Sequence, residues 1–176
     1  MRAMNAESET FSQTMDEMCS RARTAAAALA TQPAAARDAA LRAAAGALRD
    51  AASSILDANA KDMAAYKGSA AFGDRLLLNP ARVEAMAKGL EEVADLPDPL
   101  AHTLAEWTRP NGLRIARIAQ PIGVLGMIYE SRPNVGADAA AIALKSGNAI
   151  ILRGGSESFH SAQAIHQAVT TGLRLS

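Results

Sequence analysis

The sequence predicts an α/β protein in which amino-terminal helices are followed by a β hairpin arm and by an incomplete parallel sheet. Three observations predict this fold class. Apolar residues recur at spacings of three and four through the first half of the chain, as in amphipathic helices. Alternating extended residues then flank a Pro-Asn-Gly turn. Two short apolar runs finally enclose a helical segment, which is the pattern of a strand-helix-strand unit. The expected parts are residues 1–97, 98–120 and 121–176.

The helical part is expected to contain three helices. The first covers Met15–Ala30, and the second covers Pro33–Gly68 without a break along one apolar stripe. A loop is expected around Gly73. The pair Asn79 and Pro80 has the pattern of an N-cap followed by the first helical residue. It opens a third helix, which ends before two further prolines.

The remaining segments predict extended structure with one helix between two strands. The turn Pro110–Gly112 joins the two halves of the hairpin arm. The run Ile122–Tyr129 is almost entirely apolar, which is typical of a strand buried on both faces of a parallel sheet. A helix over Val135–Lys145 then ends with Gly147 at its C-cap. The run Ala149–Leu152 is expected to form a second buried strand.

Two strands are fewer than an open sheet ordinarily contains. Such sheets have about four to six strands, and two strands with their crossover helices would leave much apolar surface uncovered. The chain is therefore expected to be part of a longer protein, or to need a partner.

Composition argues against several classes of function. Eighteen basic and eighteen acidic residues give a formal net charge of zero, so no general field attracts nucleic acid or an anionic membrane. The start of the chain lacks the pattern of a signal peptide, and no apolar run is long enough to span a membrane. We expect a cytoplasmic protein. Cys19 is interpreted as structural, and the spacing of His102, His160 and His166 predicts no metal site.

Two loops are expected at the carboxyl edge of the sheet, where open α/β sheets bind ligands. In the loop Arg153–Ser158, two glycines permit the close approach of a ligand. Ser156 can cap the helix that follows, and the start of that helix favours an anion such as phosphate. A flexible turn between strand and helix explains the same residues. Spacing alone does not decide between the two, because the standard phosphate-loop motifs are absent.

The other loop contains Arg132 and Asn134. The amide of Asn134 is the type of group that stabilises a developing oxyanion, although an asparagine in this position also suits a helix N-cap. The two roles are compatible. Arg132 and Arg153 are candidates for binding a phosphate or a carboxylate, and solvated surface positions are the alternative.

Two segments carry a specific resemblance to a known family. The stretches PIGVLGMIYESRPNV and ALKSGNAIILRGGSES resemble γ-glutamyl phosphate reductase, or glutamate-5-semialdehyde dehydrogenase, a branch of the aldehyde dehydrogenase superfamily. The likeness extends back through LDANAKDM and covers most of the chain from about Ala40. It implies that the sheet is the first part of an aldehyde-dehydrogenase-like Rossmann sheet.

The resemblance also implies an activity and a set of site residues. The activity is the NADPH-dependent reduction of γ-glutamyl phosphate to glutamate 5-semialdehyde and phosphate, in proline biosynthesis. The oxyanion-hole donor is Asn134, and Arg153 replaces a lysine in a way that suits NADP over NAD. The implied cofactor contacts are Ser131, Arg132, Arg153, Gly154, Gly155, Ser156 and Glu157.

The resemblance implies that the cysteine nucleophile lies in a catalytic domain beyond residue 176, and Cys19 does not match it. The chain alone is therefore expected to be inactive. The alternative is a non-catalytic fragment that binds a nucleotide or another protein, either as a homo-oligomer or with a complementary chain.

Overall fold

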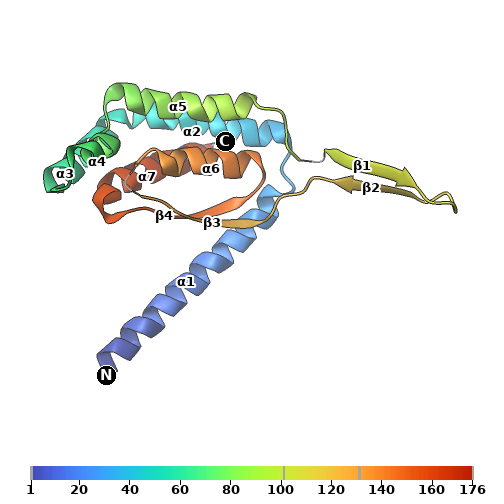
Figure 1. The fold of residues 1–176 in the computed structure, drawn as a ribbon, viewed down its shortest axis with the longest axis horizontal. Helices are drawn as coiled ribbons and strands as arrows, with labels where there is room; N and C mark the ends of the chain where they lie inside the picture. The colour runs from blue at the N-terminus through green and yellow to red at the C-terminus, as the bar shows by residue number, and fades with distance from the viewer. Residues whose placement is uncertain (1, 101, 131, 176) are drawn as a thin grey trace.

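The computed structural model describes residues 2–100, 102–130 and 132–175, with side chains described from residue 10 onward. It is an α/β structure, as predicted (Figure 1). The elements in chain order are α1 (Arg2–Leu29), α2 (Ala34–Asp50), α3 (Ala52–Ala65), α4 (Ala70–Leu76), α5 (Pro80–Asp95), β1 (Thr103–Thr108), β2 (Arg114–Ile118), β3 (Val124–Ile128), α6 (Val135–Lys145), β4 (Ala149–Arg153), the 3-10 turn η1 (Ser156–Ser158) and α7 (Phe159–Leu175).

The core lies where α2 packs against α5 on one side and α7 on the other. Leu41, Leu48 and Ile165 are almost completely buried there. A Cβ added at Gly172 would lie 2.4 Å from the Cα of Ala44, so α2 and α7 touch backbone to backbone. An alanine-rich chain therefore builds its core by the close approach of helices rather than by interlocking large side chains.

One helical prediction is wrong, because the expected helix over Pro33–Gly68 is two helices. Ala51 separates α2 from α3 with φ −86° and ψ 3°. Beyond this break, α3 runs to the start of α7, where Asn59 and Asp62 bind Ser161. No glycine or proline marks the break, and beyond it α3 packs mainly against α7.

The prediction of a loop around Gly73 is also wrong. Gly73 lies inside the short helix α4 and is buried. Phe72 of this helix stacks on Tyr66, with ring centroids 5.6 Å apart. The first helix begins earlier than predicted, at Arg2, in a stretch that lacks an apolar stripe. Both differences arise where the sequence has no regular apolar period.

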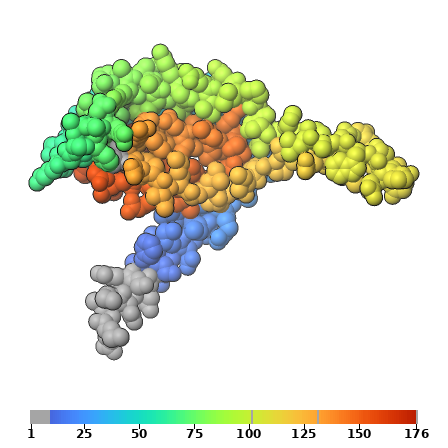
Figure 2. Space-filling model, viewed as in Figure 1, coloured from blue at the N-terminus to red at the C-terminus, as the bar shows by residue number. Residues whose placement is uncertain are grey.

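Several local signals are confirmed. The side chain of Asn79 accepts a hydrogen bond of 2.8 Å from the backbone N–H of Arg82, which caps α5. Gly112 has φ 82° in the hairpin turn, and Gly147 has φ 69° after α6. Strands β1 and β2 pair antiparallel and project from the body as an arm (Figure 2). Glycine is required at both turns, since other residues rarely adopt positive φ.

Strands β3 and β4 pair in parallel, as predicted, but the burial predicted for the first run is wrong. Ile122 and Ile128 are 81% and 85% exposed. Among the described residues the sheet has only these two strands, with α6 packed against β4 and α1 against both. α1 and α6 leave part of β3 uncovered. The apolar sequence of β3 is typical of a strand inside a sheet with more strands. Within the described ranges, none of the helices combines the length and apolar character that a membrane crossing requires.

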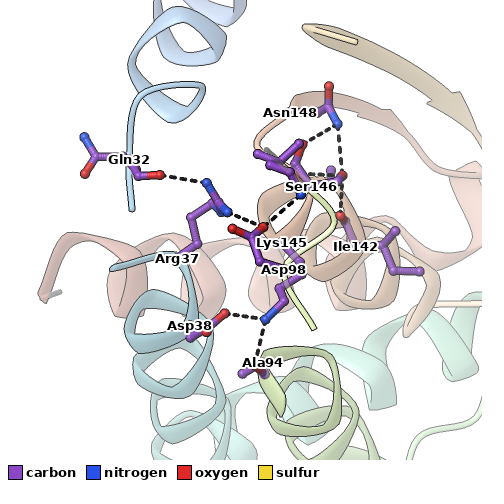
Figure 3. A network of polar contacts seen from close by, with 11 residues as sticks. Gln32, Arg37, Asp38, Ala94, Asp98, Ile142, Lys145, Ser146 and Asn148 are labelled. Carbon is purple, nitrogen blue, oxygen red and sulfur yellow. Dashed lines mark hydrogen bonds and ion pairs between the residues drawn. The ribbon is translucent and has the colours of Figure 1, made fainter. Parts of the chain in front are cut away.

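A polar network fixes α6 to the helical layer (Figure 3). The ammonium group of Lys145 donates hydrogen bonds to Asp38 at 2.6 Å and to the carbonyl oxygen of Ala94 at 2.8 Å. Nearby, Arg37 donates to Asp98 at 2.6 Å. The network joins α2, the end of α5 and the end of α6. It therefore holds the helix that begins directly after Asn134.

Candidate functional site

The two predicted loops lie side by side at one edge of the sheet. Ile128 at the end of β3 is paired with Arg153 at the end of β4. The N–H of Tyr129 extends this pairing by donating to the carbonyl oxygen of Arg153 at 3.0 Å. Because the strands are parallel, the loops that follow them meet at the carboxyl edge, as predicted.

A cavity of about 460 Å³, here named the α7 pocket, lies between these loops, α6 and α7. The sequence-predicted residues that line it are Arg153, Gly154, Gly155 and Ser156. Tyr129 forms another part of the lining, and burial raises the pKa of its hydroxyl. A Cβ at Gly154 would come within 3.1 Å of the Tyr129 side chain. Glycine therefore makes room for the tyrosine, and the pocket has the volume of a small-molecule site, about 300–1,000 Å³.

The first turn of α7 is capped by Asp62 rather than by Ser156. The carboxylate of Asp62 accepts hydrogen bonds from the N–H of His160 at 3.1 Å and from the N–H of Ser161 at 2.7 Å. Ser156 lies in the η1 turn that precedes α7. The two helical amides bound to Asp62 already have a negatively charged partner. An anion in the α7 pocket would therefore have to use the backbone before α7.

The other predicted cofactor residues lie elsewhere. Arg132 is exposed and lines a different cavity. Glu157 faces a shallow hollow beside Tyr66 and Lys67. Ser131 lies outside the described residues. Cys19 is on α1 and lines neither the α7 pocket nor the cavity that contains Arg132.

The second cavity, here named the α5 pocket, has a volume of about 390 Å³. Its charged and amide side chains are Asp74, Arg75, Arg82, Arg132, Asn134 and Asp138. Arg82 forms an ion pair with Asp74 at 3.1 Å and also donates to the carbonyl oxygen of Leu77 at 2.6 Å. Arg82 therefore holds the connection between α4 and α5 and forms one wall of the pocket.

Asn134 occupies the N-cap position of α6, but its side chain makes no capping bond. Its amide nitrogen instead donates to the carboxylate of Asp138 at 2.9 Å. An amide nitrogen carries two hydrogens, so one N–H is held and the other can donate to a ligand. The bond to Asp138 thus orients Asn134 as a donor, which is the polarity that an oxyanion requires.

Burial raises the pKa of Asp138, and the hydrogen bond from Asn134 lowers it in part. We expect the carboxyl group of Asp138 to titrate above the ordinary value for aspartate, which is about 3.9. The substitution Asn134→Ala should raise the pKa further, because it removes the donor that favours the charged form. Carbon-13 NMR of labelled aspartate carboxyls, assigned with Asp138→Asn, measures both midpoints. Asn111→Ala in the exposed hairpin turn should leave the Asp138 midpoint unchanged, and an unchanged midpoint in Asn134→Ala would contradict the bond.

Sequence reasoning missed Asp62, Asp138, Arg75 and Tyr129 as parts of this region. Asp138 could have been found, because it lies four residues after Asn134 and this spacing places side chains on one helix face. Asp62 has no such signal, since its partner His160 is 98 positions later. Among the described residues, no group of three or more His, Cys, Asp or Glu side chains could hold a metal ion.

Comparison with known proteins gives consistent matches. The model of the aldehyde dehydrogenase family matches residues 5–173. Over 154 residues the chain is 67% identical to γ-glutamyl phosphate reductase of Acidiphilium cryptum, covering 88% of the chain and 37% of that protein. It is also 67% identical over 162 residues to the γ-glutamyl phosphate reductase of Paramagnetospirillum magneticum, of which it covers 38%.

Solved structures agree with this similarity. The crystal structure of γ-glutamyl phosphate reductase from Thermotoga maritima superposes with a TM-score of 0.89 at 38% identity, over 91% of this chain and 39% of that one. The structure of γ-glutamyl phosphate reductase from Saccharomyces cerevisiae gives a TM-score of 0.85 at 32% identity, over 90% of this chain and 41% of that one. The chain thus spans about two fifths of the length of the proteins that it matches.

Proposed function

Because the chain belongs to the aldehyde dehydrogenase family, we propose that it is the cofactor-binding part of a reductase that acts on γ-glutamyl phosphate with NADPH. The product would be glutamate 5-semialdehyde, formed in proline biosynthesis. The family implies a nicotinamide cofactor. The substrate is suggested by the matched proteins, which are γ-glutamyl phosphate reductases. The observation that carries the proposal is the α7 pocket at the carboxyl edge of two parallel strands.

The lining of the α7 pocket fits a dinucleotide. Gly154 and Gly155 bring the backbone to the pocket wall without side chains, which suits the close approach of a phosphate. Arg153 is exposed at the end of β4, and its guanidinium donates to the carbonyl oxygen of Gly154. A cation at this place favours the extra phosphate of NADPH over the ribose hydroxyl of NADH. We therefore assign Arg153 to cofactor selection.

Asn134 is the residue of this chain that we place at the reacting acyl group. Its free N–H would donate to the acyl oxygen as negative charge develops there. In the proposed reaction a cysteine thiolate displaces phosphate and forms a thioester. When bound, NADPH would supply the hydride that reduces the thioester, and the C–S bond would then break to release the aldehyde and the thiolate. Cys19, on α1 and outside both pockets, does not provide the thiolate.

Calorimetric titration of the purified chain with NADPH and with NADH tests the proposal. We expect saturable NADPH binding and no NADPH oxidation when γ-glutamyl phosphate is added. The substitution Arg153→Leu should weaken NADPH binding about tenfold or more, because it removes a charge-assisted contact, and should change NADH binding less than about twofold. Arg109→Leu makes the same change on the exposed hairpin turn and should affect neither cofactor.

The outcomes separate the candidate functions. If Arg153→Leu weakened the binding of NADPH and NADH equally, Arg153 would have no role in selecting between the two cofactors. Failure of the chain to bind either cofactor would favour the alternative of a protein-interaction fragment. That alternative is supported by the exposed apolar side chains of Ile122 and Ile128. Oxidation of NADPH by the chain would contradict our exclusion of Cys19.

A further inference from the structure

The α5 pocket contains charges whose roles the proposed reaction does not explain. Arg82 and Asp74 form an ion pair with each other. In the part of the chain that the structure describes, Arg75 and Arg132 make no side-chain hydrogen bond or ion pair. Asp138 has only the amide of Asn134 as a partner there. Two guanidinium groups and one carboxylate in the pocket therefore have hydrogen-bonding atoms without a protein partner among the described residues.

We propose that the α5 pocket recognises the amino-acid end of the γ-glutamyl substrate. Asp138 binds the α-ammonium group, and Arg75 and Arg132 bind the α-carboxylate. This inference rests on the proposed function and deepens it, because it assigns the residues that select a zwitterionic acyl substrate over a plain dicarboxylic one. Asn134, which lines the same pocket, holds the acyl oxygen at the other end of the substrate.

The environment of Asp138 supports a cation beside it. One carboxylate oxygen, Oδ2, accepts the hydrogen bond from Asn134. The other, Oδ1, faces Gly89 of α5, where an added Cβ would lie 3.8 Å away. Because position 89 is glycine, no side chain from that position covers this oxygen. A half-buried carboxylate is costly to ionise, and an ammonium ligand offsets that cost.

The size and position of the pocket suit the same ligand. Its volume of about 390 Å³ lies at the lower end of the range for small-molecule sites, about 300–1,000 Å³. Asn134 and Asp138 are in hydrogen-bond contact, and the short aliphatic spacer of a glutamyl group can place its acyl and amino ends at these two neighbours. The same loop continues to Tyr129 in the α7 pocket, so the substrate and cofactor would meet across it.

Three simple ligands test this assignment on the purified chain. L-Glutamate carries both groups, glutarate lacks the ammonium group, and 4-aminobutyrate lacks the α-carboxylate. Their dissociation constants are measured by NMR chemical-shift titration. We expect L-glutamate to bind about tenfold more tightly than either analogue. Asp138→Asn should abolish the preference over glutarate and keep the preference over 4-aminobutyrate. The double substitution Arg75→Leu and Arg132→Leu should abolish the preference over 4-aminobutyrate and keep the preference over glutarate.

Matched controls and a second variant keep the test decisive. Asp50→Asn and Arg109→Leu change exposed residues outside the pocket and should leave all three affinities unchanged. Gly89→Ala adds a methyl group at van der Waals distance from Asp138, so the fold should tolerate it while glutamate binds more weakly and glutarate does not. The assignment would be overturned if the ratio of the dissociation constants for L-glutamate and glutarate were unchanged in both Asp138→Asn and Gly89→Ala. The absence of saturable glutamate binding would overturn it as well.

NADPH titration of the same variants distinguishes this inference from the proposed function. The α5-pocket variants should retain NADPH affinity, because none of the substituted residues lines the α7 pocket. Glutamate discrimination without NADPH binding would contradict the proposed cofactor and support the α5 pocket. NADPH binding without glutamate discrimination would contradict the α5 pocket alone.

Discussion

Replacement of Asp38 by alanine is expected to lower the free energy of unfolding by about 3–5 kcal/mol, the range for breaking a buried ion pair from one side. The side chain of Lys145 is only 5% exposed, and Asp38 is its only charged partner among the described residues (Figure 3). In Asp38→Ala the ammonium group would keep only the carbonyl oxygen of Ala94. Urea denaturation followed by circular dichroism measures the loss.

A double-mutant cycle separates the charge from the packing. Lys145→Met combined with Asp38→Ala should recover most of the loss, since no buried charge is then left alone. The matched control is Asp95→Ala, which breaks the exposed pair with Arg42 and should cost less than about 1 kcal/mol. Equal costs for Asp38→Ala and Asp95→Ala would show that the buried pair has no special importance.

The second large effect is expected at Asp62, which joins α3 to the first turn of α7. Asp62→Ala would leave the N–H groups of His160 and Ser161 and the hydroxyl of Ser161 without their carboxylate. Hydrogen bonds to a charged group contribute about 1.5–3 kcal/mol each, so we expect a combined loss of about 3 kcal/mol or more. Chemical denaturation gives the total, and amide hydrogen exchange at residues 160 and 161 shows whether the loss begins there.

Two comparisons make the Asp62 result specific. Asp62→Asn keeps one oxygen acceptor and should cost less than Asp62→Ala. Asp57→Ala removes an exposed carboxylate from the same helix and should change stability by less than about 0.5 kcal/mol. If exchange at residues 160 and 161 were no faster in Asp62→Ala than in Asp57→Ala, the capping role of Asp62 would be wrong.

The parts of the fold that could be predicted are those with a local cause. Asn79 followed by proline marked the start of α5, and glycines at 112 and 147 marked two turns that need positive φ. The apolar runs predicted β3 and β4, and their parallel pairing followed from the helix between them. In each case a few neighbouring residues determine the backbone, so a single sequence suffices.

The parts that could not be predicted depend on distant residues. The break at Ala51 occurs within alanines that would continue a helix, and beyond it α3 packs mainly against α7. The exposure of Ile128 depends on which elements cover β3, which its own apolar sequence does not reveal. The capping of α7 by Asp62 joins residues 98 positions apart. Tertiary packing overrides local preference at all three places.

The candidate site shows the same division. The meeting of the two loops could be predicted from the order of strands and helices, which is a topological rule. The distribution of Arg132 and Arg153 between two pockets could not, because it depends on the directions of side chains after each strand. The bond between Asn134 and Asp138 could be predicted in part. The spacing of four residues is visible in the sequence, but the sequence does not show that Asn134 is the donor and Asp138 the acceptor.

The bond between Asp62 and the start of α7 also constrains the order of events during synthesis. When the ribosome has made the helices up to α5, Asp62 has been synthesised but the N–H groups that it will bind have not. α2 likewise still lacks α7, against which one of its sides packs in the finished protein. α2 and α3 therefore reach their final packing only after residue 161 has left the ribosomal tunnel.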